Sequence, residues 1–79
     1  MYSVYVLRSL KKERRYVGMT KNLDRRLKEH NEGKNRSTKG FAPFEVVHVE
    51  KFEQRTEARK REKYLKSGTG REYLDDILK

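Results

Sequence analysis

YSVYVLRS, residues 2–9, is the stretch of sequence that decides the fold. It is rich in β-branched and aromatic residues, and its side chains alternate: Val4 and Val6 point to one face, Tyr5 and Leu7 to the other. Alternation with a period of two over this length is typical of a β-strand. We therefore predict a strand at the start of the chain and build the remaining elements outward from it.

Two further strands are predicted from the same kind of pattern. The polar stretch 10–13 is a connection, and a second strand follows at about 14–19, close enough to form an antiparallel hairpin with the first. A third strand, rich in valine, is predicted over 44–52. The basic segment 33–43 before it contains Gly and Ser and is predicted to be a loop.

Start and stop signals predict the helices. Asn22 is a suitable N-cap for a first helix that runs to about Asn31, and Gly33 is placed to close it in a left-handed conformation. A second helix is predicted over 56–66, ending at Gly68.

The last helix is predicted to open at Thr69, because Thr69–Glu72 has the capping-box pattern. Its apolar side would carry Tyr73, Leu74, Ile77 and Leu78. The order β-β-α-β-α-α predicts a small α/β (α+β) sandwich, with a three-stranded, mostly antiparallel sheet flanked by helices. We expect residues 1–79 to form a single domain.

Composition limits the classes of function. The chain contains no cysteine, which excludes a disulfide scaffold and thiolate metal sites. No apolar run approaches the roughly 18 residues of a membrane span, so we expect a cytoplasmic protein with no membrane partner. Lys and Arg number 21 against 12 Asp and Glu, a net charge of +9. This excess favours a polyanionic partner such as nucleic acid, since each neutralised phosphate releases counterions.

Charged and polar side chains occupy helix faces that should be apolar. In the helix 22–31, the apolar stripe also carries Arg26 and His30 at helical spacing, and Glu62 falls on the inner face of the helix 56–66. Burying a charge without a partner costs several kcal/mol, so these groups must either pair or line a partly wet cleft. A structural Arg26–Glu62 ion pair with His30 beside it satisfies this requirement, and so does a functional site.

Two tyrosines and a glycine on the first two strands are ambiguous in the same way. Tyr5 lies in the middle of its strand and Tyr16 on the adjacent one, where they could form a cross-strand packing pair or part of a site. Gly18 weakens a strand interior, which indicates either the close approach of a ligand or backbone, or a bulge.

Taken in order, these residues resemble the GIY-YIG nuclease family. The supporting segments are Ser3-Val4-Tyr5, Tyr16-Val17-Gly18-Met19-Thr20, Leu23-x-x-Arg26-x-x-x-His30-Asn31-x-Gly33 and Ala58-x-x-x-Glu62. The resemblance covers nearly the whole chain and is greatest to the small stand-alone bacterial subgroup. The first triad reads Ser-Val-Tyr where the family name has Gly-Ile-Tyr, but Tyr5, the chemically relevant member, is present.

The resemblance implies a metal-dependent endonuclease that hydrolyses phosphodiester bonds in DNA, leaving 5′-phosphate and 3′-hydroxyl ends, with a role in repair, recombination or turnover. It implies that Glu62 binds one divalent metal, Mg²⁺ or Mn²⁺, and that Tyr5 accepts the proton of the attacking water with help from Tyr16. Arg26 would lower the pKa of Tyr5 and contact the phosphate. His30 would hydrogen-bond Tyr5 or the phosphate, or act as an alternative base.

The remaining basic residues are assigned by position. The loop residues expected to contact phosphates, unless the loop is merely solvated, are Lys34, Arg36, Thr38 and Lys39. A solvated helix face is predicted for Lys60, Arg61, Lys63 and Lys66. The alternative function is a non-catalytic or weakly catalytic nucleic-acid-binding module on the same fold. The sequence does not identify a protein partner that would supply specificity. A purely structural interaction domain explains the inward polar residues poorly.

Overall fold

Three antiparallel strands form the middle layer of the protein, in the order β2-β1-β3. In the computed structural model, which describes residues 1–78, β1 spans Tyr2–Ser9, β2 spans Arg15–Thr20 and β3 spans Phe44–Phe52. The three predicted strands are confirmed, the second with its bounds displaced by one residue. β1 is suited to the central position because both of its faces are apolar: Val4 and Val6 lie on one face, Tyr5 and Leu7 on the other.

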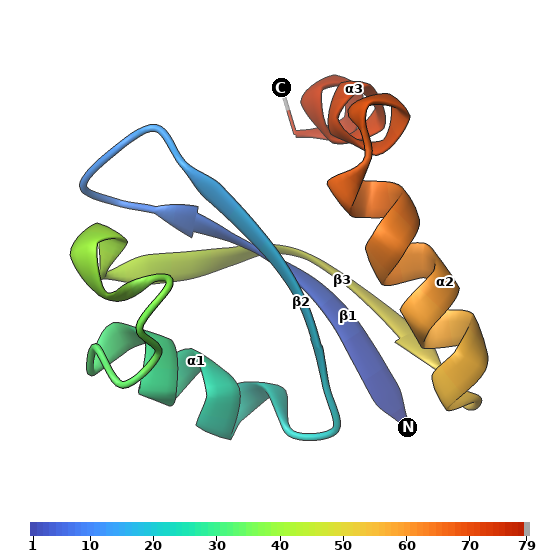
Figure 1. Cartoon of the computed structure of the whole chain (residues 1–79), viewed down its shortest axis with the longest axis horizontal. Coiled ribbons are helices and arrows are strands. Elements are labelled where there is room, and N and C mark those ends of the chain that lie inside the picture. Colours follow the sequence, from blue (N-terminus) through green and yellow to red (C-terminus); the bar gives the residue numbers. More distant parts are fainter. Residues whose placement is uncertain (79) are drawn as a thin grey trace.

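Helices cover both faces of this sheet, as Figure 1 shows. Helix α1, Leu23–Asn31, lies on one face, while α2, Arg55–Lys66, and α3, Gly68–Ile77, lie on the other. A short 3₁₀ helix, η1, occupies Lys39–Phe41 in the loop before β3. The predicted β-β-α-β-α-α order and α+β class are confirmed. Within residues 1–78, no helix has the length and apolar character needed to cross a bilayer.

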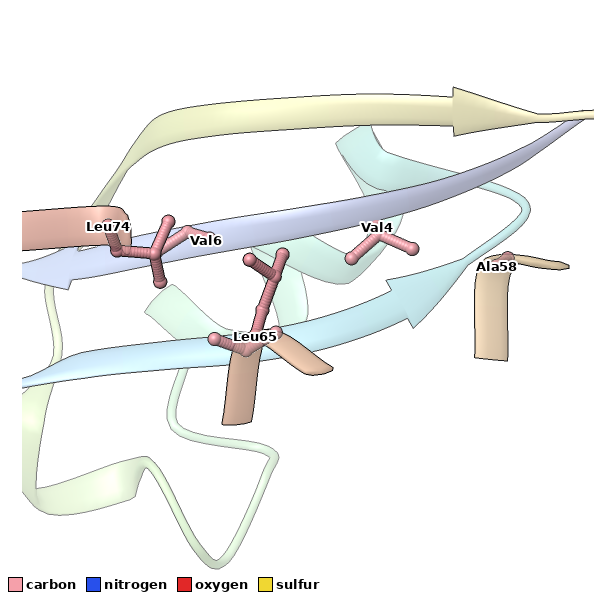
Figure 2. Close-up of a cluster of buried hydrophobic side chains, with 6 residues drawn as sticks. Val4, Val6, Ala58, Leu65 and Leu74 are labelled. Atoms are coloured by element: carbon pink, nitrogen blue, oxygen red, sulfur yellow. The ribbon is translucent and has the colours of Figure 1, made fainter. Parts of the chain in front are cut away.

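The larger apolar cluster lies between the sheet and α2–α3. Val4 and Val6 of β1 point toward Ala58 and Leu65 of α2 and toward Leu74 of α3 (Figure 2). All five are fully buried or nearly so. Full burial of a valine or leucine side chain stabilises a fold by about 1.5–3 kcal/mol, so this cluster holds the two C-terminal helices on the sheet.

A β-bulge interrupts the alternation of side chains along β3. The register with β1 shifts between Val6 and Leu7, so that Val6 is opposite His48 and Leu7 is opposite Val46. Val47 is the extra residue, and it packs in the α2-side cluster while Val46 packs in the α1-side cluster. The extra residue interrupts strict alternation, which is why Val46 and Val49, three residues apart, both pack in the α1-side cluster.

The ends of α1 follow the sequence signals. The side chain of Asn22 accepts a hydrogen bond from the backbone of the first turn at 3.1 Å, as predicted for an N-cap. At the other end Gly33 has a φ of +74°, its N–H bonds to the His30 carbonyl, and the Lys34 N–H bonds to the Glu29 carbonyl. This is a Schellman motif, which turns the chain back over the last turn of α1.

The predicted start of α3 is wrong. Ser67, not Thr69, is the N-cap: its hydroxyl accepts a hydrogen bond from the Gly70 N–H at 3.1 Å, and the helix already begins at Gly68. Because one residue, Ser67, both ends α2 and caps α3, no separate turn is needed. The apolar side is also narrower than predicted, since Ile77 is exposed.

Candidate active site

Tyr5 lies across the backbone of the neighbouring strand. It pairs with Gly18 of β2, and a Cβ built on Gly18 would lie 2.4 Å from the Tyr5 hydroxyl oxygen and 2.5 Å from Cζ. Any side chain at Gly18 would therefore displace the tyrosine ring. The group that approaches Gly18 closely is the Tyr5 side chain, not the ligand or backbone considered from the sequence, and the β1–β2 register shows no bulge.

An aromatic cluster forms around this contact on the α1 side of the sheet. Tyr16, two residues before Gly18, places its ring centroid 6.4 Å from that of Tyr5 and 4.9 Å from that of His30. The two tyrosines are diagonal neighbours, because Tyr16 itself is opposite Leu7. Residues from both strands and from α1 thus meet at one place.

His30 is completely buried in this cluster, with both ring nitrogens engaged. Its Nε2 lies 3.2 Å from the Tyr5 hydroxyl and its Nδ1 lies 2.8 Å from the Thr38 hydroxyl. Burial, and next the positive charge of Arg26, lower the pKa of His30 from its ordinary value of 6.5. The imidazole is therefore neutral at pH 7, with one N–H and one acceptor nitrogen.

Thr38 departs from the sequence-based prediction. Only 3% of its surface is exposed, and its hydroxyl is bonded to His30. The predicted phosphate contact of Thr38 is therefore wrong. The reason is the Schellman turn at Gly33, which directs the loop inward over the end of α1.

Burial has the largest effect on the pKa of Tyr5, because only 1% of the surface of this residue is exposed. Burial and the neighbouring Tyr16 raise the pKa of Tyr5 to about 12, while Arg26 acts in the opposite direction. Arg26 lowers the pKa of Tyr5, as expected, but burial outweighs this effect. Tyr5 is therefore a neutral phenol at pH 7 in the free protein.

Arg26 connects Tyr5 to the surface. Its side chain is 45% exposed, forms an ion pair with Glu29 at 3.4 Å, and interacts with Tyr5 closely enough to raise the pKa of the guanidinium. A surface cleft of about 420 Å³ is lined by Arg26 and Glu29 together with Lys34, Asn35 and Arg36. Two of the predicted loop residues thus lie beside Arg26. Lys39 is exposed on η1.

Glu62 approaches from the helix layer on the opposite face of the sheet. It is 7% exposed, and its carboxylate accepts hydrogen bonds from Arg59 at 3.3 Å and from Lys66 at 3.2 Å. The ion pair between Arg26 and Glu62 considered from the sequence is wrong, because each residue pairs within its own helix. The negative charge of Glu62 is the smallest of the effects on the pKa of Tyr5, and it raises that pKa.

The donor set around Glu62 fits one kind of metal ion. Among residues 1–78, no three His, Cys, Asp or Glu side chains gather closely enough to hold a metal. A lone carboxylate suits Mg²⁺ or Mn²⁺, which keep several waters and complete their shells with phosphate oxygens. The side chains of Arg59 and Lys66 are both more than half exposed and can move aside. The residues therefore fit an ion that binds together with a phosphate-containing substrate.

A second cleft, of about 590 Å³, lies between β2 and the helices α2 and α3 and shares Tyr16 with the site. Its basic side chains are Arg14, Arg15, Lys66 and Arg71. Arg14, Arg15 and Arg71 were not assigned to a site from the sequence. The adjacent arginines at 14–15 could have indicated a basic surface, but only the packing of α3 places Arg71 in the same cleft.

The predicted solvated face of α2 is only partly correct. Lys66 bonds to Glu62, and Arg61 donates two hydrogen bonds to Glu50 at 2.7 and 3.1 Å. The Arg61 guanidinium also lies 5.0 Å from the ring centroids of Tyr64 and Tyr73. Arg61 therefore ties α2 to β3 and α3.

Comparison with known proteins identifies the class to which this arrangement belongs. The family model described as the GIY-YIG catalytic domain matches residues 1–74. The chain therefore belongs to the GIY-YIG family, as the residues quoted from its sequence indicated. Membership supports nuclease chemistry and a nucleic-acid substrate at the level of the family.

Within this class, the chain is similar to UPF0213 proteins. It is 41% identical over 78 residues to one from Clostridium perfringens (98% of this chain, 83% of the relative), and 43% identical over 65 residues to one from Natronomonas pharaonis (81% and 75%). The solution NMR structure of the UPF0213 protein BH0048 from Bacillus halodurans has a TM-score of 0.58 and 34% identity, over 98% of this chain and 85% of that one. The predicted subgroup is thereby confirmed.

Proposed function

We propose that this protein is a metal-dependent endonuclease that hydrolyses phosphodiester bonds in DNA, in repair, recombination or turnover. The observation that carries the proposal is the convergence of Tyr5, Tyr16, Arg26 and His30 beside an exposed basic cleft, with the charge of Glu62 acting on Tyr5. A phenol, an imidazole, a guanidinium and a carboxylate supply the groups that phosphodiester hydrolysis requires.

The proton of the attacking water passes through Tyr5 and His30 together. With a pKa of about 12, only about one Tyr5 in 100,000 is ionised at pH 7, so the phenol is a poor base by itself. His30 Nε2 lies 3.2 Å from its hydroxyl and can take the phenol proton while the phenol oxygen takes one from water. The pair thus acts as one base, and the proton ends on the imidazole.

Arg26 binds the phosphate that is cut. Its guanidinium lies between Tyr5 and solvent, and its planar fork can donate two parallel hydrogen bonds to non-bridging oxygens. These bonds strengthen as negative charge grows on those oxygens in the transition state. Lys34 and Arg36 line the same cleft and contact neighbouring phosphates without reading sequence.

Glu62 holds the metal ion, Mg²⁺ or Mn²⁺. When bound, the ion supplies positive charge at the phosphate and at the leaving oxygen. Arg59 and Lys66, which neutralise the carboxylate in the free protein, would have to release it for an ion to bind. Lys66 lines the cleft beside β2, where it contacts the substrate backbone together with Arg14 and Arg71.

The proposal is tested with labelled duplex, branched and single-stranded DNA, and with RNA, incubated with Mg²⁺ or Mn²⁺. We expect cutting by the wild type and none by Arg26→Ala or Glu62→Ala. Matched controls are Arg25→Ala, the adjacent exposed arginine on α1, and Glu57→Ala, an exposed glutamate on α2; both should cut at wild-type rates. Melting temperatures measured for all five proteins verify that each is folded.

Equal cutting by the wild type and by both site variants would identify a contaminating nuclease and end the proposal. A melting temperature that rises in Arg26→Ala or Glu62→Ala while activity is lost would strengthen it, since functional groups are commonly retained at a cost in stability. A binding module is the second candidate, because Glu62 already has two cationic partners without a metal. It predicts DNA binding with no cutting on any substrate.

A further inference from the structure

Thr38, His30 and Tyr5 form a buried line of polar groups that ends on a backbone carbonyl. Their exposed fractions are 3%, 0% and 1%. The Tyr5 hydroxyl is 3.2 Å from His30 Nε2, and His30 Nδ1 is 2.8 Å from Thr38 Oγ1. Thr38 Oγ1 in turn lies 3.4 Å from the carbonyl oxygen of Asn35, to which the Thr38 N–H also bonds.

The chemistry of the two ends sets the direction of the hydrogen bonds. A carbonyl oxygen can only accept, so the Thr38 hydroxyl donates to Asn35 and its oxygen is left to accept from His30 Nδ1–H. A neutral imidazole has one N–H, so Nε2 is then an acceptor for the Tyr5 hydroxyl. At the other end Arg26, which has only donors, cannot take the phenol proton.

We propose that Thr38 is a positioning residue that fixes the Nδ1–H tautomer of His30 and thereby directs an acceptor nitrogen at the Tyr5 hydroxyl. The opposite tautomer would present an N–H to Tyr5 and leave the phenol proton with no acceptor. The consequence for cleavage rests on the proposed endonuclease function; the tautomer itself does not. Thr38 touches no substrate in this role.

The tautomer is read directly from the imidazole nitrogen chemical shifts of isotope-labelled protein near pH 7, without DNA or metal. His48→Gln identifies the His30 signals, since the chain has two histidines. Thr38→Val keeps the side-chain shape and removes the hydroxyl, while Thr38→Ser restores it. Ser37→Ala is the matched control, because Ser37 is an exposed hydroxyl in the same loop that also bonds to Asn35.

We expect the Nδ1–H tautomer in the wild type, in Thr38→Ser and in Ser37→Ala, and its loss in Thr38→Val. Cleavage should fall about 10-fold or more in Thr38→Val, as for other residues that orient a functional histidine, and be retained in the other two. A proton on Nε2 in the wild type, or an unchanged tautomer in Thr38→Val, would overturn the inference.

These outcomes separate the two proposals. Cutting with the wrong tautomer would reject the role of Thr38 and leave the endonuclease intact. The Nδ1–H tautomer in a protein that cuts no substrate would reject the endonuclease and uphold the assignment of the hydrogen bonds. If Thr38→Val does not fold, the spectra of the wild type and of Thr38→Ser still decide, since both must show the proton on Nδ1.

Discussion

Replacing Gly18 with alanine is expected to destabilise the protein and to disable the site by one steric mechanism. The added Cβ would lie 2.4 Å from the Tyr5 hydroxyl oxygen, 2.5 Å from Tyr5 Cζ and 3.0 Å from Tyr16 Cε2, where ordinary contact begins near 3.4 Å. The Tyr5 ring must therefore move by about 1 Å. It is buried against His30, so it cannot move without disturbing that hydrogen bond.

The size of both effects follows from this displacement. Overfilling a packed core costs about 1–3 kcal/mol. In a domain of this size, each kcal/mol lowers the melting temperature by about 4–8 °C. A displacement of about 1 Å in a reacting group lowers the rate about 100-fold. Gly18→Ala should therefore remain folded at room temperature, with a melting temperature several degrees below that of the wild type. It should cut DNA at about 1% of the wild-type rate.

The assays are thermal unfolding followed by circular dichroism and single-turnover cleavage. Gly40→Ala is the matched control: a Cβ there meets no atom within 4 Å, so stability should change by less than about 0.5 kcal/mol. Combining Gly18→Ala with Tyr5→Phe removes the contact to the hydroxyl but leaves the contact to Cζ, and should recover only part of the lost stability. If Gly18→Ala were as stable and as active as Gly40→Ala, Tyr5 would not lie across Gly18, and the site geometry would be wrong.

Two further predictions concern charge. Burial raises the pKa of Glu50, but hydrogen bonds from Arg61 and His48 outweigh it and hold the pKa below its ordinary value of 4.5. Stability from this carboxylate is therefore fully present above pH 4.5 and is lost as the pH falls through the lower folded-state pKa. The melting temperature of Glu50→Gln should accordingly fall less than that of the wild type as the pH is lowered below 4.5; parallel curves would refute the network. DNA binding by Glu62→Ala, measured by fluorescence anisotropy, should weaken steeply with salt, and adding Arg36→Ala should reduce the slope of log affinity against log salt by about 1; a salt-independent affinity would contradict the phosphate contacts.

The sequence by itself determined the order of the elements and the fold class, and it singled out the candidate site residues. Alternation in residues 2–9 and helical spacing are local properties, so strands, helices and the inward faces of His30 and Glu62 could be deduced without coordinates. Start and end signals were less secure. Thr69 matched a capping pattern, but Ser67 was closer to the end of α2 and provided the cap.

Only the tertiary structure decided which of these groups meet, how deeply each is buried and what each one contacts. Thr38 became a partner of His30 because a turn at Gly33 folds the loop inward, and Tyr5 acquired a raised pKa because both faces of β1 are covered. By contrast, the ion pairs of Glu62 with Arg59 and Lys66 have i,i+3 and i,i+4 spacing within α2 and could have been read from the sequence. Periodicity states which way a side chain points, whereas desolvation and hydrogen bonding depend on atoms brought from distant parts of the chain.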